Sequence, residues 1–113
     1  MYYNFEAGNK AYKLRLNTRS IVLLEKQLGC NPLSVFTRSS ENNLPTVTDM
    51  VAILHASMQQ YHHGITLNDA YDIFDKYLED GNSATDFVTV ILEIYKASGI
   101  IPNSKEAQDE GNA

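Results

Sequence analysis

Tryptophan is absent from this 113-residue chain, and cysteine occurs once, as Cys30. A single cysteine cannot form an internal disulfide, so the chain needs no oxidising compartment in order to fold. No apolar run comes near the roughly 20 residues that are required to span a bilayer. The first four residues, MYYN, also lack the charged and then apolar pattern of a secretory signal peptide. We therefore expect a cytoplasmic protein that has no membrane partner.

Basic side chains are scarce in the last two-thirds of the chain. Residues 1–40 carry six basic side chains against Glu6 and Glu25, a net charge of +4, whereas residues 41–113 carry three against twelve acidic ones, a net charge of −9. A nucleic-acid-binding surface needs Lys and Arg to displace phosphate counterions, so this distribution argues against DNA or RNA as a ligand. It does permit head-to-tail attraction between copies of the chain, or attraction to a basic partner.

The first sixteen residues have the alternating pattern of a β-hairpin. Apolar and polar residues alternate on both sides of the turn-forming sequence Gly8-Asn9-Lys10. One face of the hairpin is therefore apolar and has to be covered by helices, because two strands alone are only marginally stable in water. The alternating apolar residues are Tyr3, Phe5, Tyr12, Leu14 and Leu16.

Helical segments follow the hairpin, and each has its own start and stop signals. A helix is expected from Asn17 or Thr18 to Gly29, and a shorter one after Asn31-Pro32. Each of the three longer helices begins with Thr or Ser and has Asp three residues later, which is a capping-box spacing with a shorter acid in place of Glu. These helices are expected from Thr46 (with Asp49) to His62, from Thr66 (with Asp69) to Gly81 and from Ser83 (with Asp86) to Gly99.

The sequence thus predicts a mainly α fold, in which an N-terminal β-hairpin over residues 1–16 packs on a bundle of about four to five short helices. Residues 1–102 are expected to form a single domain. Residues 39–43 are a predicted polar loop. Residues 103–113 form an acidic tail that lacks periodicity, and we expect this tail to be disordered.

No combination of residues indicates catalysis, a cofactor or a metal site. His55 and His62 lie along one edge of the same predicted helix, but their backbones are about 10 Å apart along its axis, whereas helical ligand pairs lie at i and i+4. No histidine is placed so as to indicate a catalytic pair with Cys30. We therefore expect Cys30 to be a small buried hydrophobic residue and not a nucleophile. Glycine-rich phosphate loops and nucleophile-elbow motifs are also absent.

An acidic face is predicted on the helix that begins at Thr66. Its acidic residues lie opposite apolar residues at helical spacing, which argues against an EF-hand, because that site needs a non-helical loop. Two interpretations stay open, a solvated surface and a docking surface for a partner. The candidate acidic docking face consists of Asp69, Asp72, Asp75 and Glu79.

The last helix is more apolar than a surface helix needs to be. Its apolar residues between Phe87 and Tyr95 cover about 200° of the helix circumference, and roughly half that arc is enough to face a core. Either this helix is central, with neighbours on two sides, or part of it contacts another chain. The candidate partner or self-interface consists of Val88, Ile91, Leu92, Tyr95, Ile100 and Ile101.

Three segments of the chain resemble the tail assembly chaperones of long, flexible-tailed bacteriophages and prophages of Gram-positive hosts. They are YKLRLNTRSIVLLEKQLGCNPLSVF (12–36), VAILHASMQQYHHGITLNDAYDIFDKYLEDG (51–81) and FVTVILEIYKASGII (87–101). They span most of the chain in the same order, and none is a catalytic signature. The resemblance implies a mainly α-helical fold with a small β element and no catalytic residues.

The resemblance also implies a role and partners. Such chaperones are thought to coat the long, hydrophobic tape-measure protein in the host cytoplasm before the tail tube polymerises around it, and they are absent from the mature virion. In many members a ribosomal frameshift yields a longer product that recruits tail tube subunits, and this chain resembles the short form. Self-association of copies along the partner is expected. The alternatives are a small bacterial helical adaptor or regulatory protein unrelated to virion assembly, and a small metal-dependent enzyme.

Overall fold

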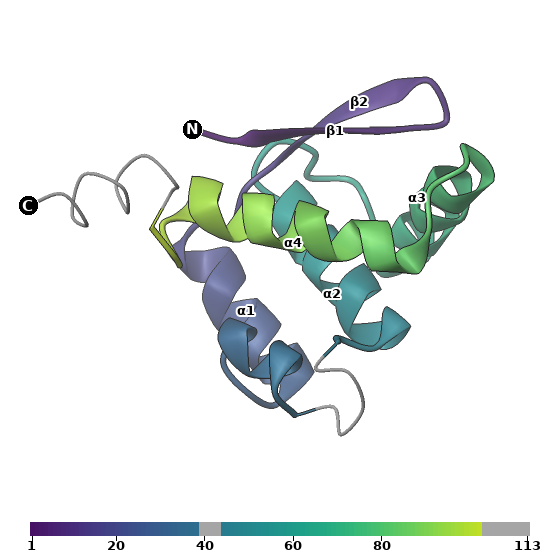
Figure 1. The fold of residues 1–113 in the computed structure, drawn as a ribbon. Coiled ribbons are helices and arrows are strands. Elements are labelled where there is room, and N and C mark those ends of the chain that lie inside the picture. The colour runs from purple at the N-terminus through teal and green to yellow at the C-terminus, as the bar shows by residue number, and fades with distance from the viewer. Residues whose placement is uncertain (39–43, 103–113) are drawn as a thin grey trace, which may run out of the picture.

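Residues 1–38 and 44–102 are described in the computed structural model, where they form a two-stranded hairpin, four α-helices and a short 3-10 helix (Figure 1). The elements are β1 (Tyr3–Ala7), β2 (Lys10–Leu14), α1 (Thr18–Leu28), η1 (Pro32–Phe36), α2 (Val47–Met58), α3 (Leu67–Glu79) and α4 (Ala84–Ser98). The predicted mainly α fold with an N-terminal hairpin is confirmed. The predicted polar loop and the predicted acidic tail, residues 39–43 and 103–113, lie outside the described residues.

The hairpin is antiparallel, with Phe5 opposite Tyr12, and both of these side chains are buried. Its turn requires positive φ angles at Gly8 (59°) and Asn9 (67°), as in the two-residue turns whose twist matches that of paired strands. The backbone N–H of Gly8 donates a hydrogen bond of 2.8 Å to Asp80 at the end of α3. The apolar side of the hairpin covers α3 and α4 through β1 and α2 through β2, as expected for a two-stranded sheet that cannot stand alone (Figure 1).

Helix α2 is the centre of the domain. It packs against α1, α3, α4 and β2, and every residue from Asp49 to Leu54 is buried. A helix that is apolar on all sides is expected to be enclosed by neighbours, and α2 lies between α1 and α3 with α4 across it (Figure 1). The other helices are buried on one side and exposed on the other, so the core lies around α2.

The predicted end of α2 at His62 is wrong, since the helix ends at Met58. The side-chain amide of Gln59 donates to the carbonyl oxygens of His55 (3.0 Å) and Ile65 (2.9 Å), and so connects the last helical turn to the loop that follows. These bonds hold the loop against the end of α2. Helical periodicity continues through this segment, but the side chain of Gln59 stabilises a turn there.

Two of the three predicted capping boxes are complete, those of Thr66 with Asp69 and Ser83 with Asp86. In the third, the Thr46 hydroxyl accepts from the backbone N–H of Asp49 at 3.1 Å. The carboxylate of Asp49 is buried and forms an ion pair with Arg38 instead of returning to the backbone N–H of Thr46. This ion pair joins the segment after η1 to the first turn of α2.

The His62 ring connects the loop after α2 to the hairpin. Its Nε2 atom accepts the backbone N–H of Lys13 at 3.0 Å, and its ring lies edge-on to Tyr12 at 5.4 Å. Desolvation lowers the pKa of His62 below its ordinary value of 6.5, and the positive charges of Lys13 and Lys10 lower it further. A protonated Nε2 atom cannot accept the hydrogen bond from Lys13, so the contact requires the neutral imidazole.

We expect acid to weaken the fold at His62 before the carboxylates titrate. The unfolded histidine has the higher pKa, so its stabilising contribution is complete above 6.5 and is lost as the pH falls through the folded-state value. Urea unfolding of wild type between about pH 7 and about pH 5 is expected to show this loss, and His62→Gln is expected to remove it. His63→Gln, which changes the exposed neighbour, is the matched control and should keep the wild-type pH dependence. An unchanged profile for His62→Gln would contradict the assignment.

Candidate protein-binding surfaces

Part of the interface predicted on α4 lies inside the domain. Ile91 and Tyr95 have no exposed surface. The Tyr95 hydroxyl donates to the carbonyl oxygen of Pro32 at 2.8 Å, and its ring lies edge-on to Phe36, so η1 covers this part of α4. Burial raises the pKa of Tyr95 well above its ordinary value. The prediction that Ile91 and Tyr95 contact a partner is therefore wrong, because α4 buries that side against β1, α2 and η1.

A narrow apolar strip of α4 stays at the surface. Leu92 is 37% exposed, and Val88, one helical turn earlier, is partly exposed. Ile100 and Ile101, just beyond the helix, are partly buried and pack against the core. Of the six residues predicted for this interface, these four keep some accessible surface. We refer to Val88 and Leu92 as the α4 strip.

Asp69, one of the four predicted acidic docking residues, has a structural role. Its carboxylate accepts the backbone N–H of Thr66 at 2.9 Å, and its own backbone N–H donates to the Thr66 hydroxyl at 3.1 Å. These hydrogen bonds lower the pKa of Asp69, because they stabilise the ionised form. Asp69 therefore caps the start of α3.

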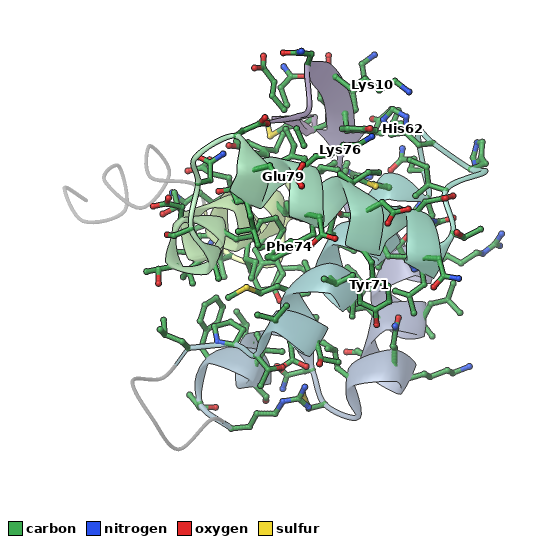
Figure 2. The ribbon with its side chains drawn as sticks, turned by 90° about the vertical axis from the view of Figure 1, so that its right-hand side faces the viewer. Lys10, His62, Tyr71, Phe74, Lys76 and Glu79 are labelled. Carbon is green, nitrogen blue, oxygen red and sulfur yellow. The ribbon has the colours of Figure 1, made fainter. Side chains whose placement is uncertain are left out.

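The other acidic residues of α3 form one outward face together with two exposed apolar side chains. Tyr71 is 45% exposed and Leu78 is 37% exposed, and the two lie seven positions apart on the same side of the helix. Figure 2 looks onto this helix, with Tyr71 near one end and Glu79 near the other. The opposite side carries buried Phe74 and faces α2. The acidic α3 face is defined as Tyr71, Asp72, Asp75, Leu78 and Glu79, all of them exposed.

A second outward face, on α1, was not predicted. Val22 is 43% exposed and Leu23 is 57% exposed, and both lie beside Arg19 and Lys26 around a shallow hollow of about 490 Å³. The signal in the sequence was the run Ile21 to Leu24, which has more apolar residues than one helical face can bury. The basic α1 face is defined as Arg19, Val22, Leu23 and Lys26, all of them exposed.

The basic α1 face and the acidic α3 face lie on opposite sides of the domain. Helices α1 and α3 both pack against α2, one on each side of it. Figure 1 has α1 at the lower left and α3 at the right, and in Figure 2, after a quarter turn, α3 is in front and α1 is behind. The uneven charge of the sequence thus becomes two separate surfaces of opposite sign.

Three other kinds of feature would indicate a function in the described residues, namely a metal site, a membrane-spanning helix and a ligand pocket. Across 1–38 and 44–102 there is no group of three or more His, Cys, Asp or Glu side chains placed to hold a metal ion. Within those same ranges no helix is both long enough and apolar enough to cross a membrane. A polar hollow of about 580 Å³ lies between the hairpin and the α3–α4 connection, where Asp80 already accepts the N–H of Gly8.

Comparison with known proteins gives one result. A family model described as a family of unknown function, DUF6096, matches residues 4–113. The chain belongs to this family. The match covers almost all of the hairpin and every helix of this DUF6096 member, so the family is defined by the hairpin and the helices together. Neither a curated protein nor a solved structure matches the chain.

Proposed function

We propose that this DUF6096 member is a non-catalytic tail assembly chaperone of a long-tailed bacteriophage or prophage. In this proposal it binds the tape-measure protein in the cytoplasm of the bacterial host and is absent from the mature virion. A longer, frameshifted form would recruit tail tube subunits. The resemblance of residues 12–36, 51–81 and 87–101 to such chaperones supports this role.

One structural observation carries the proposal, namely where the exposed apolar side chains lie. Five of the large exposed apolar side chains lie on the outward faces of α1, α3 and α4 among charged and polar residues, and the hollow beside those of α1 is shallow. Small-molecule sites are typically concave and mostly apolar, whereas protein-binding surfaces are flatter and have polar rims. A coat protein that binds a long polypeptide in many copies needs modest patches of this kind, because repetition strengthens weak contacts.

The α4 strip is the surface that we assign to the tape-measure protein. It is a narrow apolar line on a helix whose other side is anchored in the core, so Val88 and Leu92 are held in fixed positions. Fixed apolar side chains bind with little loss of conformational entropy. A long, hydrophobic helical partner would lay its own apolar stripe along them.

Leu92→Asp is expected to weaken capture of a tape-measure segment about tenfold or more, because a carboxylate would replace the most exposed apolar side chain of the strip. The measurement is co-purification after coexpression of the full chain with a segment of the tape-measure protein from the same genome. Val47→Asp is the matched control, since Val47 is 51% exposed at the start of α2, away from the strip. Equal capture by wild type and Leu92→Asp would exclude the strip, and no capture by wild type would contradict the proposed function.

The genes next to the coding sequence give a second, independent test. A tail tube gene upstream, an overlapping −1 or +1 reading frame and a very long gene downstream are expected for a tail assembly chaperone. A neighbourhood with no virion genes would contradict the proposal and favour the adaptor alternative.

A further inference from the structure

We propose that copies of this chain associate head to tail, with the basic α1 face of one copy docked on the acidic α3 face of the next. The occupant of each face is thus a second copy of the same chain. The inference depends on the charge and shape of the two surfaces, and it holds whether or not the tape-measure protein is a partner.

The basic α1 face combines two positive charges with two apolar side chains. At 100° per residue its four members lie within about 100° of helix circumference, with Arg19 and Lys26 between Val22 and Leu23. No acidic side chain is exposed among them, since Glu25, on the far side of Val22, is partly buried. A pair of cations flanked by apolar side chains fits a partner surface that combines carboxylates with apolar residues.

The acidic α3 face has that composition. Its five members lie within about 120° of the helix circumference, with Tyr71 and Leu78 along one edge and three carboxylates beside them. The one basic residue of the helix, Lys76, lies at the outer edge of this arc, where its side chain contacts Gly8 at the tip of the hairpin. Figure 2 shows Lys76 near the hairpin and Tyr71 at the far end of α3. In the proposed contact, three negative charges of the acidic α3 face therefore meet two positive charges of the basic α1 face, and each face also contributes two apolar side chains.

The positions of the two faces determine the kind of assembly. The two faces point in opposite directions across α2, so one molecule cannot bring its own faces together. For the same reason, the two copies in a two-fold dimer cannot form both contacts between an α1 face and an α3 face at once. A contact between two different faces leaves one free face at each end, so copies add to a growing chain or close into a ring. The contact surfaces are small and carry opposite charges, so the association should be weak and sensitive to salt.

The test uses the full chain in sedimentation velocity over a concentration series. Wild type is expected to form larger species as its concentration rises, and raising the salt from about 0.05 M to about 0.5 M should suppress them. Arg19→Glu with Lys26→Glu, and separately Asp75→Lys with Glu79→Lys, should each weaken the association about tenfold or more. An equimolar mixture of these two double variants should associate again, because each variant then meets a face of opposite charge.

Two controls separate the contact from folding and from net charge. Lys10→Glu with Lys13→Glu changes the net charge as much as the α1 double variant does, on exposed residues of β2, and should keep the association. The charge-reversed residues are also exposed, so far-ultraviolet circular dichroism should be unchanged. If the α1 double variant does not fold, Arg19→Gln with Lys26→Gln replaces it. A wild type that stays monomeric at low salt, or a mixture that does not associate, would overturn the inference.

This test is separable from the test of the proposed function. The α4 strip belongs to neither charged face, so Leu92→Asp should self-associate like wild type. The α1 double variant should still capture a short tape-measure segment as a single copy. If Leu92→Asp and the α1 double variant each lost both self-association and capture of the tape-measure segment, the assignment of separate surfaces would be contradicted.

Discussion

Phe87→Ala is expected to lower the free energy of unfolding by about 3–5 kcal/mol, the largest loss that we predict for a simple truncation. Phe87 on α4 is fully buried, and its ring lies 5.2–5.8 Å from those of Phe5, Phe74 and Tyr77. These three rings come from β1 and α3. Removal of the central ring therefore weakens the junction of the hairpin with both helices and leaves a cavity that its neighbours cannot fill.

Urea unfolding of the full chain measures this loss, and Val88→Ala is the matched control. Val88 is the next residue and is partly exposed, so its truncation should cost about 1 kcal/mol or less. Tyr77 supplies a second measurement, because burial raises its pKa to about 12 and the charge of Asp86 adds to the effect. In Phe87→Ala the pKa of Tyr77 should fall toward 10.0, the ordinary value. A loss like that of Val88→Ala would show that the four rings do not pack as a unit.

Ile91→Asp is expected to abolish the folded state at 25 °C. Ile91 has no exposed surface, and in the described residues its neighbours in the core are apolar. A carboxylate placed there has no partner and costs several kcal/mol in addition to the lost burial of isoleucine. The total stability of a domain is about 5–15 kcal/mol, so this one change removes most or all of it.

Leu92→Asp, at the next position, is the matched control for this prediction. Leu92 is 37% exposed, so its carboxylate can stay hydrated and the domain should fold. Far-ultraviolet circular dichroism and thermal unfolding distinguish the two variants. If Ile91→Asp melted like wild type, α4 would not pack as the structure has it, and Ile91 would again be a candidate for the interface.

The comparison of these two variants matters for function as well as for folding. A variant that unfolds loses every partner, so lost capture in Ile91→Asp would say nothing about an interface. Leu92→Asp separates binding from folding, because its effect is confined to the surface. Tests of the tape-measure proposal should therefore use exposed residues of the α4 strip.

Local structure was predictable from the sequence, because each signal involves residues close together in the chain. The hairpin turn at Gly8-Asn9 and the completed capping boxes at Thr66 and Ser83 depend on their own backbone and on residues three positions away. The exposure of Asp72, Asp75 and Glu79 followed in the same way, from helical spacing alone. For these features no distant part of the chain had to be known.

Only the tertiary structure decided which apolar surfaces are enclosed. Periodicity gave α4 an apolar arc of about 200° and made it a candidate for the central helix, yet α2 is the central helix, because the other elements pack around it. The same packing buries Ile91, leaves Leu23 exposed, and turns the Asp49 carboxylate toward Arg38 and away from its cap. Hydrophobic pattern measures how much of a helix can be buried, whereas burial itself depends on which neighbours arrive from distant parts of the chain.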